Sequence, residues 1–247
     1  MTQRIDGRKP DELRPIRMQL GFLETAEGSC WIEYGKTRVL CTASFQDSLP
    51  SWKTDSSGWV TAEYGMLPKS SKTRISREIN KPKGRTAEIQ RLIGRAIRAV
   101  TDFEALGNRM VNIDCDVIQA DGGTRTAAVT GAMLAFWEAC HLMSAAGIFQ
   151  YWPIRERIAA VSVGQVHGVS MLDLCYSEDS TADVDMNVVL TESGKIVEIQ
   201  GTAESSPFSR QDLDEMFALA SQGISELLAR QAEAIRHLVP STGPRRS

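Results

Sequence analysis

The chain has 247 residues, of which 42% are hydrophobic, and it carries a formal net charge of −3. This length and apolar content suffice for one large domain or two closely packed halves, which excludes a disordered or fibrous protein. No apolar run approaches the roughly 20 residues that cross a bilayer, and the N-terminal stretch MTQRIDGRKPDELRPIR is charged where a signal peptide would be apolar. We therefore expect a globular protein of the cytoplasm without a membrane partner.

Cysteines and histidines show neither a metal-binding pattern nor a disulfide framework. The cysteines lie far apart, without a CxxC pair and mostly inside apolar segments, which favours buried thiols. The three histidines are equally scattered. Catalytic chemistry is therefore expected to rest on carboxylates and arginines. The cysteines are Cys30, Cys41, Cys115, Cys140 and Cys175.

In chain order, the first clear pattern is CWIEYGKTRVLCTASF at 30–45, which predicts two strands joined by a hairpin. A basic block follows. Between Lys69 and Arg98 there are ten lysines and arginines against Glu78 and Glu88, a local charge of +8 that leaves −11 for the rest of the chain. Charge runs are most often solvated helix faces, but this one begins in a loop-like stretch punctuated by glycine and proline. The block is therefore a candidate surface for a polyanion.

Three regular elements are predicted in the middle of the chain. Apolar residues recur at helical spacing from Thr86 to Leu106, which predicts one amphipathic helix. The alternation in VNIDCDVI at 111–118 predicts a half-buried strand. The segment at 126–145 is apolar almost all round, which predicts a buried helix.

The second half of the chain continues the alternation of strands and helices. Strand-like runs occupy 159–166 and 170–176, and a hairpin is predicted over 186–204. Ser209, followed three residues later by Asp212, predicts the N-cap of a long final helix. Strands interleaved with long helices favour layered α and β structure.

The stretch CDVIQADGGTRTAAVTGA at 115–132 runs from a strand pattern through two glycines into a helix pattern. Backbone N–H groups at a helix N-terminus lack intrahelical partners and, with the positive end of the helix dipole, attract an anion. Arg125 follows the glycines and could clamp the same anion. Taken alone, such a stretch is more often a plain strand-to-helix connection, so it predicts an anion site only together with other signals.

Four carboxylates lie within LCYSEDSTADVDMNVV at 174–189, between two strand-like runs. Carboxylates gathered at a strand junction suit Mg²⁺, and their crowding raises the pKa of one of them so that it can donate a proton. An acidic surface loop is the commoner meaning of such a cluster. Asp185 argues against that meaning because it directly precedes an apolar run in which a strand should enter the sheet. The four are Glu178, Asp179, Asp183 and Asp185.

Five motifs, in this order, resemble those of the ribonuclease PH family. The resemblance extends from DGRKPDELRPI to the final helix and thus over nearly the whole chain. The motifs are GWVTAEYGMLP (58–68), GRTAEIQRLIGRAIRAV (84–100), DCDVIQADGGTRTAAVTGA (114–132), DSTADVDMNVV (179–189) and VEIQGTAESSPFSR (197–210).

The resemblance implies an α+β fold of layered mixed sheets and helices with a core like ribosomal protein S5 domain 2. It implies one catalytic domain over 1–240, with a flexible tail at 241–247. It further implies a ring-shaped homo-hexamer, a trimer of dimers, that trims RNA 3′ ends by phosphorolysis. The substrates would be transfer-RNA precursors above all, together with ribosomal RNA, and the products nucleoside diphosphates.

The resemblance also assigns roles to single residues. Gly123, Thr124 and Arg125 would form the phosphate-binding turn, with Arg85 reaching the same inorganic phosphate, which is the co-substrate. Asp185 would be the general acid or metal-positioning carboxylate at the leaving 3′ oxygen, and Asp179 would assist through Mg²⁺. Lys69, Arg74 and Arg77 would face the incoming RNA. The loop between Arg77 and Arg85 departs from the family pattern, so Lys81 and Lys83 receive no role.

Two other classes of function remain open at this point. One is an RNA-binding ring subunit with a degenerate site, against which the joint presence of Arg85, the Gly-Thr-Arg turn and Asp185 argues. The other is a nucleotide-dependent kinase or NTPase. The sequence contains neither a Gly-x4-Gly-Lys-Ser/Thr nor a Gly-x-Gly-x-x-Gly stretch, so this second class has little support.

Overall fold

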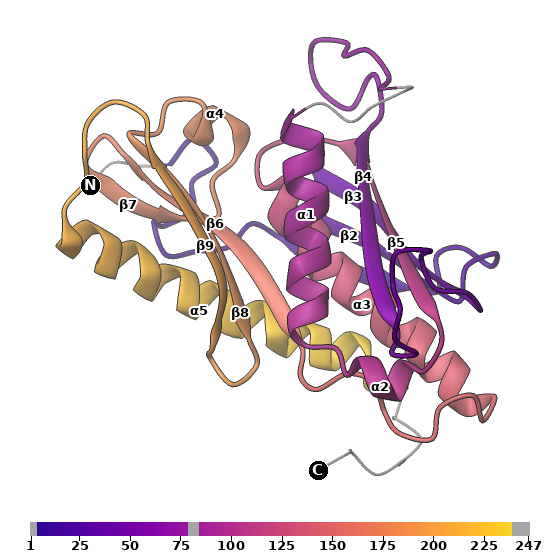
Figure 1. Ribbon diagram of the computed structural model, residues 1–247. Helices are drawn as coiled ribbons and strands as arrows, with labels where there is room; N and C mark the ends of the chain where they lie inside the picture. The colour runs from indigo at the N-terminus through magenta and orange to yellow at the C-terminus, as the bar shows by residue number, and fades with distance from the viewer. Residues whose placement is uncertain (1–3, 79–83, 239–247) are drawn as a thin grey trace.

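The computed structural model describes residues 4–78 and 84–238. It contains two β-sheets with helices between and beside them, which confirms the predicted α+β class of layered mixed sheets and helices (Figure 1). The predicted tail at 241–247 lies outside the described residues, as do Lys81 and Lys83.

The first sheet has five strands in the order β1-β2-β3-β5-β4. Its neighbours pair antiparallel, except β4 and β5, which are parallel because α1 and α2 connect them. The hairpin predicted at 30–45 is confirmed as β2 and β3, and the strand predicted at 111–118 is β5. The strands are β1 (Ile16–Leu20), β2 (Gly28–Tyr34), β3 (Thr37–Gln46), β4 (Trp59–Met66) and β5 (Met110–Gln119).

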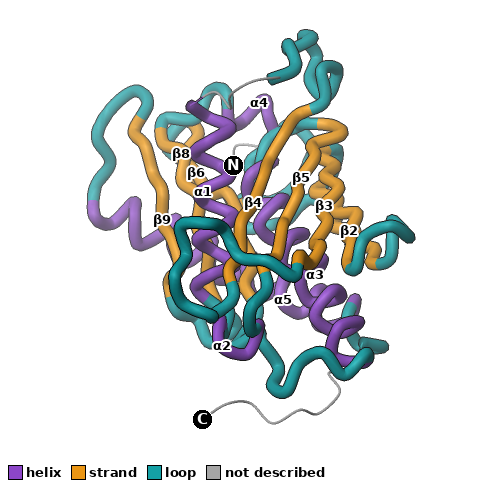
Figure 2. The backbone as a smooth tube through the Cα atoms, turned by 45° about the vertical axis from the view of Figure 1, so that its right-hand side comes forward, coloured by secondary structure: helices purple, strands orange, loops and turns teal. Residues whose placement is uncertain are grey.

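The second sheet has four antiparallel strands in the order β7-β6-β8-β9. Figure 2 separates the two sheets, with the strands of this one on the left of the view. The predicted hairpin at 186–204 is confirmed as β8 and β9. The strands are β6 (Ile158–Val166), β7 (Val169–Leu172), β8 (Val184–Thr191) and β9 (Ile196–Ala203).

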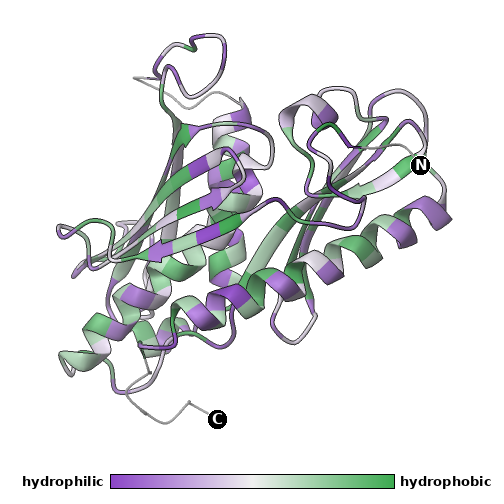
Figure 3. Cartoon of the chain, turned by 180° about the vertical axis from the view of Figure 1, so that it is seen from behind, coloured by the Kyte–Doolittle hydropathy of each residue, from purple (hydrophilic) through white to green (hydrophobic). Residues whose placement is uncertain are grey.

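Three long helices connect and cover the sheets. α3 (Thr124–Ala145) packs on β2 and β3 of one sheet and on β6 of the other, so it lies between the sheets and is buried as its apolar sequence predicts. α1 (Gly84–Ala99) packs on β4 and against α3. α5 (Arg210–Ala234) lies across the four-stranded sheet, with hydrophilic and hydrophobic residues alternating along it (Figure 3). Its N-cap is the predicted capping box of Ser209 and Asp212.

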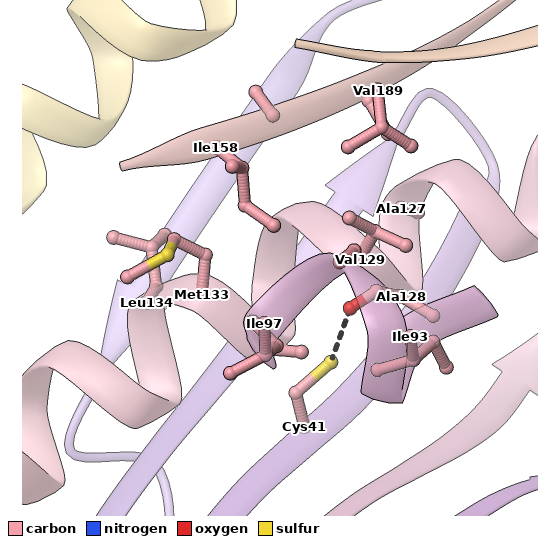
Figure 4. Close-up of a cluster of buried hydrophobic side chains, with 14 of the residues drawn as sticks. Cys41, Ile93, Ile97, Ala127, Ala128, Val129, Met133, Leu134, Ile158 and Val189 are labelled. Carbon is pink, nitrogen blue, oxygen red and sulfur yellow. Dashed lines mark hydrogen bonds between the residues drawn. The ribbon is translucent and has the colours of Figure 1, made fainter. Parts of the chain in front are cut away.

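One hydrophobic core serves both sheets. Figure 4 shows part of it, where the Sγ of Cys41 on β3 donates a hydrogen bond to the carbonyl oxygen of Ala128 on α3 at 3.7 Å. The helix can lie this close to the sheet because Gly131 faces β2 and β3. A Cβ at that position would come within 2.7 Å of Cys41 Sγ. All five cysteines are buried free thiols, as predicted.

Two predicted elements are wrong in their extent. The helix predicted from Thr86 to Leu106 ends at Ala99, and the short α2 (Phe103–Leu106) follows. At the break Thr101 pairs with Ile154, and the Asp102 carboxylate accepts hydrogen bonds from two N–H groups of α2 and so caps a new helix. The strand predicted at 170–176 ends at Leu172 with β7, and α4 (Tyr176–Asp179) begins where further strand was expected.

Candidate active site

The two glycines after β5 make the turn that starts α3. Gly122 and Gly123 have φ angles of +77° and +65°, a left-handed conformation that other residues adopt at a cost. The hydroxyl of Thr37 donates to the Gly122 carbonyl oxygen at 2.6 Å and accepts from the Asp121 N–H at 2.9 Å. The Gly122 carbonyl oxygen and the Asp121 N–H are therefore both hydrogen-bonded to β3. The first N–H groups of a helix have no intrahelical partners, so those at the start of α3 can donate hydrogen bonds to an anion.

A buried ion pair supports the same turn from behind. Arg14 donates to the carbonyl oxygen of Asp121 at 2.6 Å and forms two hydrogen bonds, of 2.7 and 3.0 Å, with the carboxylate of Asp173. Asp173 itself has a φ of +54° and is fully buried. The N-terminal segment, the turn before α3 and the turn after β7 are thus held together. Sequence reasoning did not find this pair.

Arg125, the second residue of α3, reaches across to the four-stranded sheet. One of its guanidinium nitrogens donates to Oε1 of Gln200 on β9 at 2.7 Å and lies 3.5 Å from Oε1 of Glu88 on α1. The amide nitrogen of Gln200 donates to the same Glu88 oxygen. This network fixes the direction of the guanidinium. Its other nitrogens have no partner among residues 4–78 and 84–238, so they could bind an anion. Glu88 and Gln200 lie in two of the motifs quoted above, which was the only sequence signal for them.

Arg85 is the second residue of α1 and is exposed. Burial raises the pKa of Asp179 and of Asp185, and the charges of Arg85 and Arg125 partly oppose that rise. The two arginines therefore share one neighbourhood with the two carboxylates. Each arginine also lies in the first turn of its helix, so two helix N-termini and two guanidinium groups converge on one place.

The two carboxylates come from different elements of the second half of the chain. Asp179 ends α4, and Asp185 is the second residue of β8, opposite Gly164 and Thr202. Burial, followed by the negative charge of Asp179, raises the pKa of Asp185 to about 6, in spite of the nearby arginines. Burial raises the pKa of Asp179 as well. The pair therefore holds a proton more readily than two solvated carboxylates would.

The other two carboxylates of the acidic stretch point elsewhere, so the four do not converge. Glu178 receives two hydrogen bonds from Arg4, of 2.7 and 2.8 Å. Asp183 accepts from the backbone N–H of His167 at 3.1 Å and from the Ser205 hydroxyl at 2.9 Å. Across the described residues, no group of three or more His, Cys, Asp or Glu side chains could hold a metal ion.

The basic loop before α1 is described from Lys69 to Glu78, and its charged side chains are solvent-exposed. Lys69, Arg74 and Arg77 are all exposed. Arg77 lies near enough to Asp116 on β5 for its charge to lower the pKa of that carboxyl, which burial raises. The loop after β4 therefore brings Arg77 into the neighbourhood of β5, the strand that pairs with β4.

Comparison with known proteins decides the family. The 3′ exoribonuclease family, domain 1, matches residues 12–140, and domain 2 of the same family matches residues 156–223. The chain belongs to the RNase PH family of 3′ exoribonucleases. It is 55% identical over 232 residues to a ribonuclease PH from Neisseria meningitidis, which covers 93% of this chain and 96% of that relative. The protein is accordingly a phosphorolytic 3′-to-5′ exoribonuclease.

Solved structures show the same fold at much lower identity. The Archaeoglobus fulgidus exosome with RNA bound to the active site superposes with a TM-score of 0.80 at 22% identity, over 93% of this chain and 92% of that one. Rice (Oryza sativa) Rrp46 superposes with a TM-score of 0.73 at 17% identity, over 96% and 100% of the two chains. Both matches support the α+β fold of the family.

A membrane-spanning helix was not expected. Within residues 4–78 and 84–238, the structure has no helix long and apolar enough to cross a membrane.

Proposed function

We propose that phosphorolysis takes place where the N-termini of α1 and α3 face Asp179 and Asp185. One observation carries this assignment. Two arginines and two carboxylates share this place, and the pKa of Asp185 is raised to about 6 although both arginines oppose the shift. Strongly perturbed groups beside opposite charges are typical of reaction sites. The surrounding elements are held by hydrogen bonds, so the site is organised in advance of its substrates.

In this proposal Arg85, Gly123, Thr124 and Arg125 bind inorganic phosphate. Phosphate must approach an equally negative phosphodiester, and the guanidinium groups and N–H groups offset that repulsion while they hold the attacking oxygen in line. The oxygen forms a bond to the phosphorus of the 3′-terminal nucleotide, and the bond from that phosphorus to the 3′ oxygen of the shortened RNA breaks. The released product is a nucleoside 5′-diphosphate.

Asp185 and Asp179 serve the leaving side of the reaction. The leaving 3′ oxygen must gain a proton or be stabilised, and a carboxyl with a pKa of about 6 can donate one near neutral pH. Two carboxylates without a third ligand also fit Mg²⁺, which commonly keeps water and substrate phosphates in its shell. Asp179 and Asp185 would hold that ion, which when bound would neutralise charge on the phosphoryl oxygens.

We further propose that the substrates are the 3′ ends of transfer-RNA precursors in the cytoplasm, trimmed by a single catalytic domain spanning 1–240. The exposed Lys69, Arg74 and Arg77 would contact RNA phosphates. One such loop spans few phosphates, whereas loops gathered in a homo-hexamer, a trimer of dimers, would bind one RNA by avidity. Subunits dissociated from the ring should therefore lose structured precursors before short oligonucleotides. Equal activity of isolated and assembled subunits on a precursor would contradict this.

The test of the proposed reaction is product release from oligo(A) with phosphate present and with phosphate removed. We expect adenosine diphosphate only when phosphate is present. Arg85→Ala should raise the phosphate concentration needed for half-maximal rate, whereas Arg95→Ala, a matched control in the same helix, should not, because Arg95 is engaged with Glu198 at 2.6 Å. Release of adenosine monophosphate in the absence of phosphate would contradict the proposal.

A further inference from the structure

A buried pair of hydroxyl groups lies directly beneath the proposed phosphate site. Tyr64 belongs to β4 and is 5% exposed, and Thr124 is the first residue of α3 and 6% exposed. The Tyr64 hydroxyl donates a hydrogen bond to Oγ1 of Thr124 at 2.9 Å. The contact joins a strand of the five-stranded sheet to the helix that starts at the glycine turn.

This contact determines what the Thr124 hydroxyl can do. A threonine hydroxyl has one proton to donate, and its oxygen already accepts the proton of Tyr64. The proton of Thr124 must therefore find another acceptor, and the hydrogen bonds among residues 4–78 and 84–238 supply none. The charges of Arg85 and Arg125 both act on the Tyr64 phenol, so the pair lies within reach of the anion-binding arginines.

A second tyrosine–threonine pair on the same helix shows the contrast. The Tyr34 hydroxyl donates to Oγ1 of Thr130 at 2.9 Å, the same distance. Here the carbonyl oxygen of Ala160 serves as an acceptor for the pair, 3.4 Å from the Thr130 hydroxyl and 3.2 Å from the Tyr34 hydroxyl. The interior pair is thus complete within the protein. In the Tyr64–Thr124 pair, by contrast, the Thr124 proton lacks an acceptor within the described part of the chain. This pair lies at the start of α3, where phosphate is proposed to bind.

We propose that Tyr64 is a positioning residue of the phosphate site, which orients the Thr124 hydroxyl so that its proton is donated to inorganic phosphate. The inference rests on the proposed function, because it takes phosphate to be the missing acceptor. Burial raises the pKa of Tyr64, so the phenol stays protonated and remains a donor throughout the neutral range. Tyr64 acts through Thr124 and makes no contact with the reacting atoms.

The experiment is a double-mutant cycle on the KM for phosphate, measured by phosphorolysis of a short oligo(A). Tyr64→Phe keeps the ring and removes the hydroxyl, and Thr124→Val keeps the shape of the side chain and removes its hydroxyl. We expect Tyr64→Phe to raise the KM for phosphate about three- to tenfold, the range of one hydrogen bond, with kcat at saturating phosphate nearly unchanged. In the Thr124→Val background the same change should have almost no effect.

Tyr34→Phe is the control, since it removes a tyrosine hydroxyl that bonds a threonine of the same helix in the interior, where it also lies 3.2 Å from the Ala160 carbonyl oxygen. It should lower the thermal midpoint by a similar amount and leave the KM for phosphate unchanged. Equal shifts in this KM for Tyr34→Phe and Tyr64→Phe would show a general packing effect and overturn the inference.

The double-mutant cycle distinguishes failure of this inference from failure of the proposed phosphate site. Each single variant changes the KM for phosphate by some factor. If the double variant changed it by the product of the two factors, Tyr64 would not act through Thr124, and the inference would be overturned. A phosphate KM raised by Thr124→Val but unchanged by Tyr64→Phe would overturn the inference alone. A phosphate KM unchanged by Thr124→Val and by Arg125→Ala would overturn the assigned phosphate site as well.

Discussion

Glu178 and Asp179 are neighbours in the sequence but belong to two different charge clusters. Burial alone would raise the pKa of Glu178, but the hydrogen bonds and charge of Arg4 bring it below the usual range. Burial raises the pKa of Asp179, and the charges of Arg85, Arg125 and Arg14 do not reverse that shift. The Glu178 carboxylate is fully paired, whereas the charge of the Asp179 carboxylate is only partly balanced.

The difference distinguishes a structural ion pair from the proposed reaction site. Arg4 is bound to Glu178 and to the carbonyl oxygens of Leu172 and Asp173, so the donors and acceptors of this cluster satisfy each other. In the second cluster the charge of Asp179 raises the pKa of Asp185. Among residues 4–78 and 84–238, Arg125 has partners only for one of its guanidinium nitrogens. In the proposed function, this incomplete cluster is completed by its substrates, phosphate and RNA.

The largest effect is expected from the structural cluster. Glu178→Gln removes the charge that balances the buried Arg4, and breaking a buried ion pair costs about 3–5 kcal/mol. Urea denaturation should show this loss, while the phosphate KM of the folded fraction stays near that of the native protein. Asp179→Asn should instead retain the native stability or exceed it. If the two variants lost equal stability, the distinction between the clusters would fail.

Asp185→Asn tests the reaction site with the smallest change of shape. It should suppress turnover on the order of 10²-fold or more if Asp185 is the general acid, while phosphate and RNA binding persist. Polymerisation from nucleoside diphosphates must fall in step, because it passes through the same transition state. Near-normal rates in both directions with excess Mg²⁺ would show that the assignment of Asp185 is wrong and make Asp179 the carboxylate to test.

The raised pKa of Asp185 also predicts a pH dependence of stability in metal-free buffer. The folded protein keeps this proton up to about pH 6, whereas the unfolded chain releases it near 3.8. The folded state binds more protons between these values, so the free energy of unfolding falls as pH rises through this window. We expect about 2 kcal/mol or less, because the side chain is partly solvated. Asp185→Asn should therefore gain stability over the native protein at pH 7 but not at pH 4; a constant difference would contradict this.

The smallest effect on turnover is expected from the basic loop. Arg74→Ala combined with Arg77→Ala should weaken RNA binding and flatten its dependence on salt, since each lost phosphate contact removes a released counterion. Turnover of saturating short RNA should change little. The measurement is the slope of log affinity against log salt for the native and double-variant proteins. An unchanged slope would show that this loop does not face the RNA.

Much of the fold could be predicted from periodicity alone. The hairpins, β5, the buried α3 and the capped α5 all have strong local patterns, and the structure confirms them. The failures lie where tertiary contacts override the local pattern. Thr101 leaves the helical pattern to form a bridge with Ile154, and the turn after Leu172 is fixed by the Arg14–Asp173 pair from the far end of the chain.

The candidate site shows the same limit. Its arginines and carboxylates stand in recognisable motifs, so the resemblance could point to Arg85, Arg125, Asp179 and Asp185. The contacts around them could not be found in this way. Glu88 and Gln200 meet Arg125, and Tyr64 meets Thr124, only through the packing of α1 and α3 on strands from both sheets. Sequence spacing carries no information on such long-range contacts.

The most direct test of the account is calorimetric titration of inorganic phosphate into the RNA-free protein. Native protein and the Arg95→Ala control should bind phosphate alike. Arg125→Ala should lose that binding while its thermal midpoint stays close to native, because Arg125 completes its charge balance with phosphate. Unchanged phosphate affinity in Arg125→Ala would contradict the claim that the partly balanced cluster at the N-termini of α1 and α3 is the reaction site.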